Sequence, residues 1–359
     1  MREVALGDAM KVRLLCLLLA LLLLPARDAG AQQVKLRANL QFPISNPVFG
    51  GSLARFKEEV EKQSRNDITI EIFDKSQLFS DYQVVDAVSS GAVDIAMTAA
   101  QQFSYKAPVV GILDQPFLFN FQALMSAAAS PGSEIRKLID EAIQAEIGVR
   151  VLWWHPLGNN VFFSKGRDVA DPERLKDQRV ASPGKLPGEF VAWCGGKASV
   201  LTIEKFHDAF KDGALDMAMV GFGALQVYGL WKFTDTVTFT HHSPIVFFLV
   251  INEKTWQSLS PTHRAAIAQA ASKVEIEIRS HQSQSEARAS AFAKGKNVKL
   301  QELTPDQVAE WRACSAGMLA DYMDKNGERA RRLMDAYGRL RTDPCCSAGP
   351  STAAAFTRR

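Results

Sequence analysis

Hydrophobic and polar positions along the chain predict strands that alternate with helices. The segment 34–41 alternates apolar and polar residues, 68–73 predicts a second strand, and 245–251 is apolar throughout. A helix is expected over about 48–64, and the strand 245–251 is expected to be buried on both faces of a sheet. Such an order of elements is typical of an α/β fold.

A short internal repeat indicates two similar units. Residues 86–97 read DAVSSGAVDIAM and residues 208–219 read DAFKDGALDMAM, with seven of twelve positions identical. Each copy predicts a helix, a glycine in the left-handed conformation and a short apolar strand. Ligands of open α/β sheets bind outside the carboxyl ends of strands, so we expect 97–99 and 219–221 to face each other across a cleft. The alternative is a coincidence between two αβ turns.

One long helix is expected to connect the two units. Ser260 is a suitable N-cap, Pro261 suits the first helical position, and neither glycine nor proline recurs before Gly295. At 1.5 Å per residue this rod is about 50 Å long, which exceeds the size of one small lobe. A strand over 298–303 and a second helix capped by Thr304 follow.

The remaining strands complete a two-lobed α/β architecture. The strand 148–154 is expected to cross into the second lobe, where 160–164, 179–182 and 216–219 continue the sheet. Crossing strands and the long helix would join the two domains. The predicted divisions are a signal peptide at 1–31, lobe I at 32–156 plus 243–285, lobe II at 157–242 plus 286–340, and a disordered tail at 341–359.

The first 31 residues have the pattern of a cleaved export signal. Arg2, Lys11 and Arg13 are basic, the apolar run 14–24 follows, and Ala-Gly-Ala at 29–31 supplies small residues for signal peptidase. An 11-residue run is too short to cross a membrane core of about 30 Å. We therefore expect a periplasmic protein that does not itself span the membrane.

Charge and motifs exclude several other classes. The chain has 42 basic and 39 acidic residues, so no basic surface for nucleic acid is indicated. No Gly-x-Ser-x-Gly, dinucleotide or phosphate-loop motif occurs, and the histidines and cysteines lack metal-ligand spacing. The sequence therefore indicates no enzyme, cofactor or metal site. Whether Cys194 pairs with Cys314 stays open.

Several short motifs of the mature chain occur in the same order and spacing as in one known family. The segments are 76–78, 91–97, 114–119, 153–154 with Gly158, 175–176, Pro183, 240–244, Asn252, Trp256 and Leu259. Together they resemble the DctP-type solute-binding proteins of tripartite ATP-independent periplasmic (TRAP) transporters. The resemblance implies a two-lobed fold like that of type II periplasmic binding proteins. The resemblance implies capture of a small organic acid by lobe closure and delivery to a small and a large membrane subunit for uptake driven by an ion gradient. Presentation of solute to a membrane sensor is the alternative.

The resemblance also places a carboxylate-binding arginine at the end of a second-lobe strand, where this chain has Ala181. Arg179 lies two residues earlier, about 6–7 Å away on the same strand face, and either reaches the site in part or is a surface residue. Asn160 offers neutral hydrogen-bonding groups instead. Met219 and Val220 replace a frequent Glu-Asn pair, so we expect a less polar wall and a solute with an apolar or aromatic body.

The residues expected to contact solute come from both lobes. They are Phe42, Asn46, Gln77, Thr98, Gln101, Trp154, Asn160, Arg179, Ala181, Met219 and His242. For Trp154 and His242 a buried structural role is the alternative.

Overall fold

The computed structural model describes residues 33–344 and 346, without the side chains of 204 and 282–285. The predicted signal peptide and most of the predicted tail therefore lie outside the described residues. None of the helices within the described ranges is long and apolar enough to cross a membrane.

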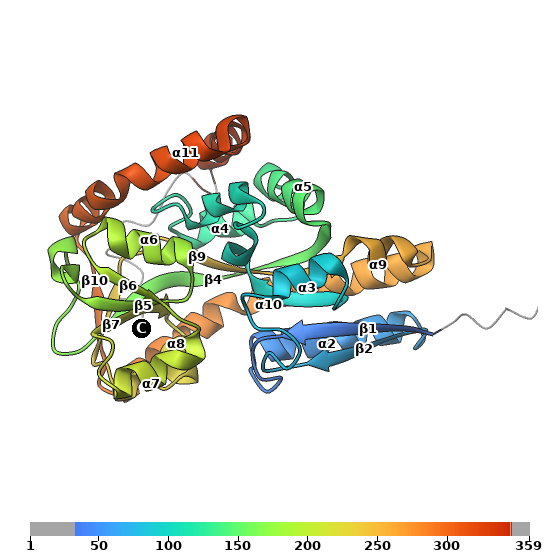
Figure 1. The fold of residues 1–359 in the computed structure, drawn as a ribbon, viewed down its shortest axis with the longest axis horizontal. Coiled ribbons are helices and arrows are strands. Elements are labelled where there is room, and N and C mark those ends of the chain that lie inside the picture. Colours follow the sequence, from blue (N-terminus) through green and yellow to red (C-terminus); the bar gives the residue numbers. More distant parts are fainter. Residues whose placement is uncertain (1–32, 345, 347–359) are drawn as a thin grey trace, which may run out of the picture.

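The first lobe is built on a mixed sheet with the order β2-β1-β3-β9-β4 (Figure 1). Its strands are β1 (Val34–Leu40), β2 (Ile68–Phe73), β3 (Ile95–Ala99), β9 (Pro244–Asn252) and β4 (Val149–Ser164). The first three are parallel, and β9 is antiparallel to both β3 and β4. Eight of the nine residues of β9 are buried, in agreement with the burial predicted for the apolar run 245–251.

The second lobe continues the sheet on the far half of β4. Its strands are β7 (Met217–Gly221), β5 (Arg179–Ser182), β6 (Lys197–Val200), β8 (Thr236–Phe239) and β10 (Lys299–Glu302). Residues of β4 from Val149 to Asn159 pair with β9, whereas those from Asn160 to Ser164 pair with β7 or β8. The predicted strands 148–154 and 160–164 are thus one strand, which crosses between the lobes as expected.

Both copies of the internal repeat form the predicted helix, glycine and strand. Helix α3 (Val84–Ser90) ends at Gly91, whose φ is 81°, and β3 follows. Helix α7 (Phe206–Lys211) is followed by Gly213, whose φ is 65°, and β7 comes next. A side chain is strained in this left-handed conformation, so glycine ends each helix at this point.

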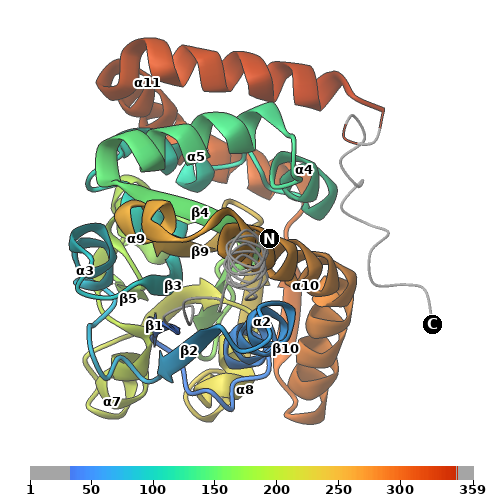
Figure 2. The same ribbon diagram turned by 90° about the vertical axis from the view of Figure 1, so that its right-hand side faces the viewer.

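Two long helices, and not one, connect the lobes. In α10 (Pro261–Gly295) the Ser260 hydroxyl accepts the amide hydrogen of His263, which confirms the predicted cap. Ala270 packs in a lobe I core and Ala293 in a lobe II core. Helix α11 (Pro305–Thr342) crosses as well, from the core around Trp311 in lobe II to lobe I. It contacts α6 (Lys185–Trp193), α4 (Gln122–Ala128) and α5 (Glu134–Ile147) (Figures 1 and 2).

This course of α11 differs from the predicted assignment of 286–340 to lobe II alone, because Tyr322, Leu333 and Ala336 are buried in lobe I. The other predicted limits of the lobes stay a prediction. The helix also contains Gly327, whose φ of 53° interrupts the regular backbone.

The remaining helices cover the sheet. They are α2 (Phe49–Gln63), α4 (Gln122–Ala128), α5 (Glu134–Ile147), α6 (Lys185–Trp193), α8 (Ala224–Val227), α9 (Glu253–Ser258) and the 3₁₀ turns η1 (Ala100–Phe103), η2 (Pro108–Asp114), η3 (Pro172–Leu175), η4 (Ile203–Lys205) and η5 (Leu230–Lys232).

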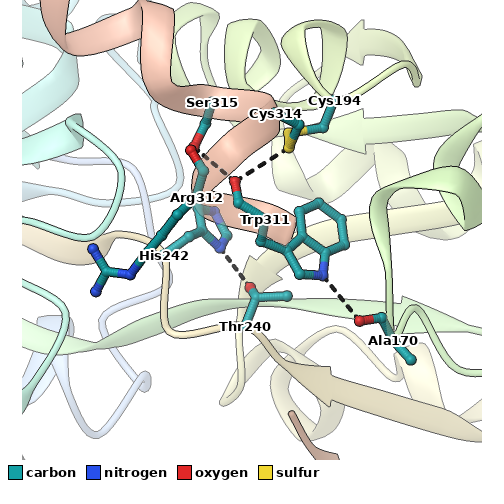
Figure 3. The surroundings of a disulfide bond; sticks show 8 residues. All are labelled: Ala170, Cys194, Thr240, His242, Trp311, Arg312, Cys314 and Ser315. Carbon is teal, nitrogen blue, oxygen red and sulfur yellow. Dashed lines mark hydrogen bonds between the residues drawn. A yellow bond between two sulfur atoms is a disulfide. The ribbon is translucent and has the colours of Figure 1, made fainter. Parts of the chain in front are cut away.

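A disulfide joins Cys194, directly after α6, to Cys314 in α11 (Figure 3). The two cysteines are 120 residues apart in the sequence. Beside the bond, the indole N–H of Trp311 donates to the carbonyl oxygen of Ala170 at 3.2 Å. Cys194 thus pairs with Cys314, which the sequence alone had left open, and the bond attaches α11 to the lobe II core.

Candidate functional site

A narrow cavity of about 60 Å³ lies between the lobes, and we call it the interlobe cavity. Lobe I contributes Gln41, Asp81, Ala99, Ala100, Gln101, Leu113 and Asp114; lobe II contributes Asn160, Pro183, Thr202, Ile203 and Val220; the start of β9 contributes Pro244, Ile245, Val246 and Phe247.

Strand ends bring these residues together. Gln41 follows β1, Ala99 ends β3, Pro183 follows β5, and Val220 is the penultimate residue of β7. Open α/β sheets bind ligands at the carboxyl ends of their strands. Ala99 and Val220 thus meet at one cavity, which confirms the expectation drawn from the repeat.

The polar residues that line the cavity include acids and amides. The Thr98 hydroxyl donates to Asp81 Oδ1 at 3.2 Å and so helps to orient this carboxylate. Asp114 is only 9% exposed, and burial raises its pKa to about 7. The amide of Asn160 donates through Nδ2 to Ser243 Oγ at 3.0 Å, while its buried Oδ1 has no partner.

Gln101 connects the two lobes directly. Its Nε2 donates to the carbonyl oxygen of Pro183 at 3.1 Å. The same side chain borders a second cavity of about 240 Å³, which lies between η1, η2, α6 and α11 and is lined among others by Tyr105, Lys185 and Trp193. The lobes are therefore closed on each other at Gln101.

Arg179 lies away from the interlobe cavity. It is the first residue of β5, whereas the cavity meets the other end of this strand. Its guanidinium makes two hydrogen bonds with Asp216, Nε to Oδ2 at 3.0 Å and Nη2 to Oδ1 at 2.8 Å. Of the two alternatives for Arg179, the structure supports the surface role. Ala181 and Met219 are fully buried in the two lobe II cores.

Trp154 and His242 are buried structural residues. The indole N–H of Trp154 donates to Asp140 Oδ1 at 2.8 Å. The ring of His242 stacks on Phe190 with centroids 4.1 Å apart, and its Nδ1 lies 2.6 Å from Thr240 Oγ1 (Figure 3). Burial lowers the pKa of His242 to about 3, so this ring is neutral at physiological pH.

Three further expected residues do not line the cavity. Phe42 stacks on Phe49 with ring centroids 4.1 Å apart in the lobe I core. Asn46 Oδ1 accepts the amide hydrogen of Phe49, the first residue of α2, at 3.0 Å. Gln77 is exposed outside the cavity. Of the expected set, Gln101 and Asn160 line the cavity directly, and Thr98 supports it.

Sequence reasoning missed the acids Asp81 and Asp114 and the pair Thr202–Ile203. Asp114 interrupts an apolar stretch of η2, where a charged residue is unusual and could have been noticed. Thr202 and Ile203 follow β6, a short and largely exposed strand whose sequence gives little apolar signal.

Two α/β lobes around a shared cavity define a solute-binding clamp. Residues 41–326 match the family model described as bacterial extracellular solute-binding protein, family 7. The chain therefore belongs to this family of solute-binding proteins, which are not enzymes.

Relatives agree with this assignment. The chain is 20% identical to the 2,3-diketo-L-gulonate-binding periplasmic protein of Escherichia coli over 61% of this chain and 66% of that protein. Among solved structures, a TRAP periplasmic solute-binding protein of Chromohalobacter salexigens with bound D-glucuronate has a TM-score of 0.79 at 20% identity, covering 84% of this chain and 99% of that one. A Bordetella pertussis extracytoplasmic receptor binding pyroglutamic acid has a TM-score of 0.78 at 19% identity, with coverage of 85% and 99%.

Proposed function

We propose that this protein is the periplasmic receptor of a TRAP transporter. It captures a small organic acid in the interlobe cavity by lobe closure and delivers it to a small and a large integral membrane subunit. An ion gradient then drives uptake. Export by a signal peptide at 1–31 would place the receptor in the periplasm.

The single observation that carries this proposal is the interlobe cavity itself. Both lobes line it at the ends of their strands, and Gln101 bridges them beside it. A solute bound here would contact both lobes at once and so favour the closed arrangement. The alternative of presenting solute to a membrane sensor has no observation in its favour.

The relatives support a small organic acid as the solute. Similar chains bind D-glucuronate and pyroglutamic acid, and an organic acid was the expectation from the sequence. An apolar or aromatic body remains a proposal, supported by Ile203, Val220 and Phe247 in the cavity wall.

A thermal-shift screen against sugar acids, lactams, alditols and amino acids tests solute capture. A solute at 100 times its dissociation constant should stabilise the protein by about 2.7 kcal/mol. Vesicles that contain the two membrane subunits should then accumulate the labelled solute only when this receptor and an ion gradient are both present. No stabilisation by any compound, or uptake without the receptor, would contradict the proposal.

A further inference from the structure

The interlobe cavity contains an acid whose carboxyl group has no partner. Asp114 is the last residue of η2, lines the cavity and is 9% exposed. Among the described residues, no group donates a hydrogen bond to its carboxyl group, and burial raises its pKa to about 7. In its protonated form a carboxyl group is neutral and donates a hydrogen bond through its O–H.

The cavity offers no cation to an anionic solute. The lining formed by the described residues includes no lysine, arginine or histidine. Ala181 is fully buried among apolar side chains of lobe II, and Arg179 pairs with Asp216 at the other end of β5. A buried carboxylate is costly unless it is paired or hydrogen-bonded. A solute carboxylate in this cavity therefore needs neutral hydrogen-bond donors.

Asn160 becomes such a donor when the two ends of its amide are exchanged. Its Nδ2 donates to Ser243 Oγ at 3.0 Å, while its buried Oδ1 has no partner among the described residues. A half turn of the amide swaps the two atoms, and the Ser243 hydroxyl then donates to the oxygen, because a hydroxyl both donates and accepts. The bond to Ser243 is kept, and an N–H group takes the position that had no partner.

Among the described residues, no charged group of a neighbouring element shifts the pKa of Asp114. Asp81 is the other titratable residue of the cavity lining, and its Oδ1 accepts the Thr98 hydroxyl hydrogen. The elements η1 and β9, which contact η2, contain no charged residue. Helices α5, α6 and α11 also contact η2, and their charged groups include the ion pairs Arg136–Glu275, Lys185–Glu189 and Asp321–Lys325 and the guanidinium of Arg312 over the ring of Phe117.

We propose that Asp114, as a carboxylic acid, and the amide of Asn160 donate hydrogen bonds to the carboxylate of the solute, so that each anion captured takes up one proton. This inference rests on the proposed capture of an organic acid in the same cavity. Both residues line that cavity of about 60 Å³, so one small solute reaches both. The proton comes from water or buffer and binds the ionised form of Asp114. Two carboxyl groups then share one proton, which avoids two adjacent buried negative charges.

The pH dependence of binding tests this coupling. Isothermal titration calorimetry with the intact mature protein uses D-glucuronate, pyroglutamate and the tightest-binding carboxylate of the thermal-shift screen, all ionised above about pH 5.5. We expect the affinity to fall by roughly thirtyfold between pH 6 and pH 8.5, because only protonated Asp114 binds the solute. Titrations at pH 8 in phosphate and in Tris, whose ionisation heats differ, should show uptake of nearly one proton per solute.

Two asparagine variants connect the coupling to this acid. Asp114→Asn keeps a neutral donor of similar size, so its affinity should change by less than about threefold over the same pH range, without proton uptake. Asp140→Asn is the matched control. Burial raises the pKa of Asp140 to about 7 as well, but this residue lies outside the cavity lining and its Oδ1 accepts the indole hydrogen of Trp154. The control should keep the pH dependence of the wild type.

The outcomes separate the two proposals. If the wild type binds a carboxylate with constant affinity from pH 6 to pH 8.5 and takes up no proton, the coupling is wrong, while solute capture stands. This result needs no variant, so it decides the matter even where a variant fails to fold. If a folded Asp114→Asn protein keeps the pH dependence, or Asp140→Asn loses it, the proton binds elsewhere and the inference is again wrong. If no carboxylate binds at any pH, capture of an organic acid fails and the inference fails with it.

Discussion

The side chain of Gln101 and the backbone of Pro183 form a hydrogen bond across the two lobes, with Nε2 and the carbonyl oxygen 3.1 Å apart. Gln101 lies in η1, the turn that follows β3 in lobe I, and Pro183 comes directly after β5 in lobe II. Both residues line the interlobe cavity. The bond therefore stabilises the closed arrangement and does so at the edge of the site.

Replacing Gln101 with alanine should shift the ligand-free protein toward an open arrangement. A neutral hydrogen bond contributes about 1 kcal/mol, so the equilibrium ratio of closed to open protein should fall by roughly fivefold. Small-angle X-ray scattering should show a larger radius of gyration, and the affinity for the best solute of the screen should weaken by up to about the same factor. Gln257→Ala, on the exposed surface of α9, is the control. An unchanged radius and affinity would show that the bond does not govern closure.

Solute affinity should depend on Asn160 and not on Arg179. Asn160→Ala removes a buried polar group of the cavity, and we expect a loss of about tenfold or more in affinity. Arg179→Ala removes only an exposed ion pair with Asp216, worth about 0–1 kcal/mol of stability, and should leave affinity unchanged. Calorimetry gives both affinities, and thermal melts check that each variant is folded. Weaker binding by a normally stable Arg179→Ala protein would contradict the position of Arg179 outside the solute site.

The parts of the fold that local chemistry determines could be predicted from the sequence. The cap at Ser260 depends on one hydroxyl and a nearby amide, and the end of α3 depends on the left-handed conformation of Gly91. The run 245–251 has no polar residue that could face solvent, so its burial followed directly. By contrast, the crossing of α11 depends on which lobe buries Leu333, and this contact is set by the tertiary fold.

The site could be predicted only in part. The family pattern identified the replacement at Ala181, and Asn160 lines the cavity as expected. The strand spacing placed Arg179 near Ala181 but could not indicate that Asp216 pairs with it at the strand's other end. Asp114 reaches the cavity from η2, whose 3₁₀ geometry has no reliable sequence pattern. Cysteine spacing alone likewise could not decide the pairing of Cys194 with Cys314.

Removal of the disulfide should destabilise the protein. The bond closes a loop of 120 residues, and restriction of the unfolded chain by such a loop contributes up to about 5 kcal/mol. We expect the double variant Cys194→Ser/Cys314→Ser to unfold at lower urea concentration than the wild type. A reductant should lower the wild-type midpoint to a similar value and leave the variant unchanged. Equal midpoints for the oxidised wild type and the variant would show that the bond contributes nothing.

Asp114→Asn should stabilise the ligand-free protein above neutral pH. Burial raises the pKa of Asp114 from 3.8 to about 7, so between these values the folded protein holds a proton that the unfolded chain has lost. The contribution of Asp114 to stability therefore falls as pH rises from about 4 to about 7, and the ionised group then destabilises the fold. Asparagine is neutral throughout, so the variant should exceed the wild type by up to roughly 4 kcal/mol at pH 8 and converge with it near pH 4. Urea unfolding at several pH values measures the difference in the free energy of unfolding between the variant and the wild type. Asp140, His155 and His242 are present in both proteins, so their contributions cancel in this difference. A difference that stays constant with pH would show that Asp114 is not an uncompensated buried acid.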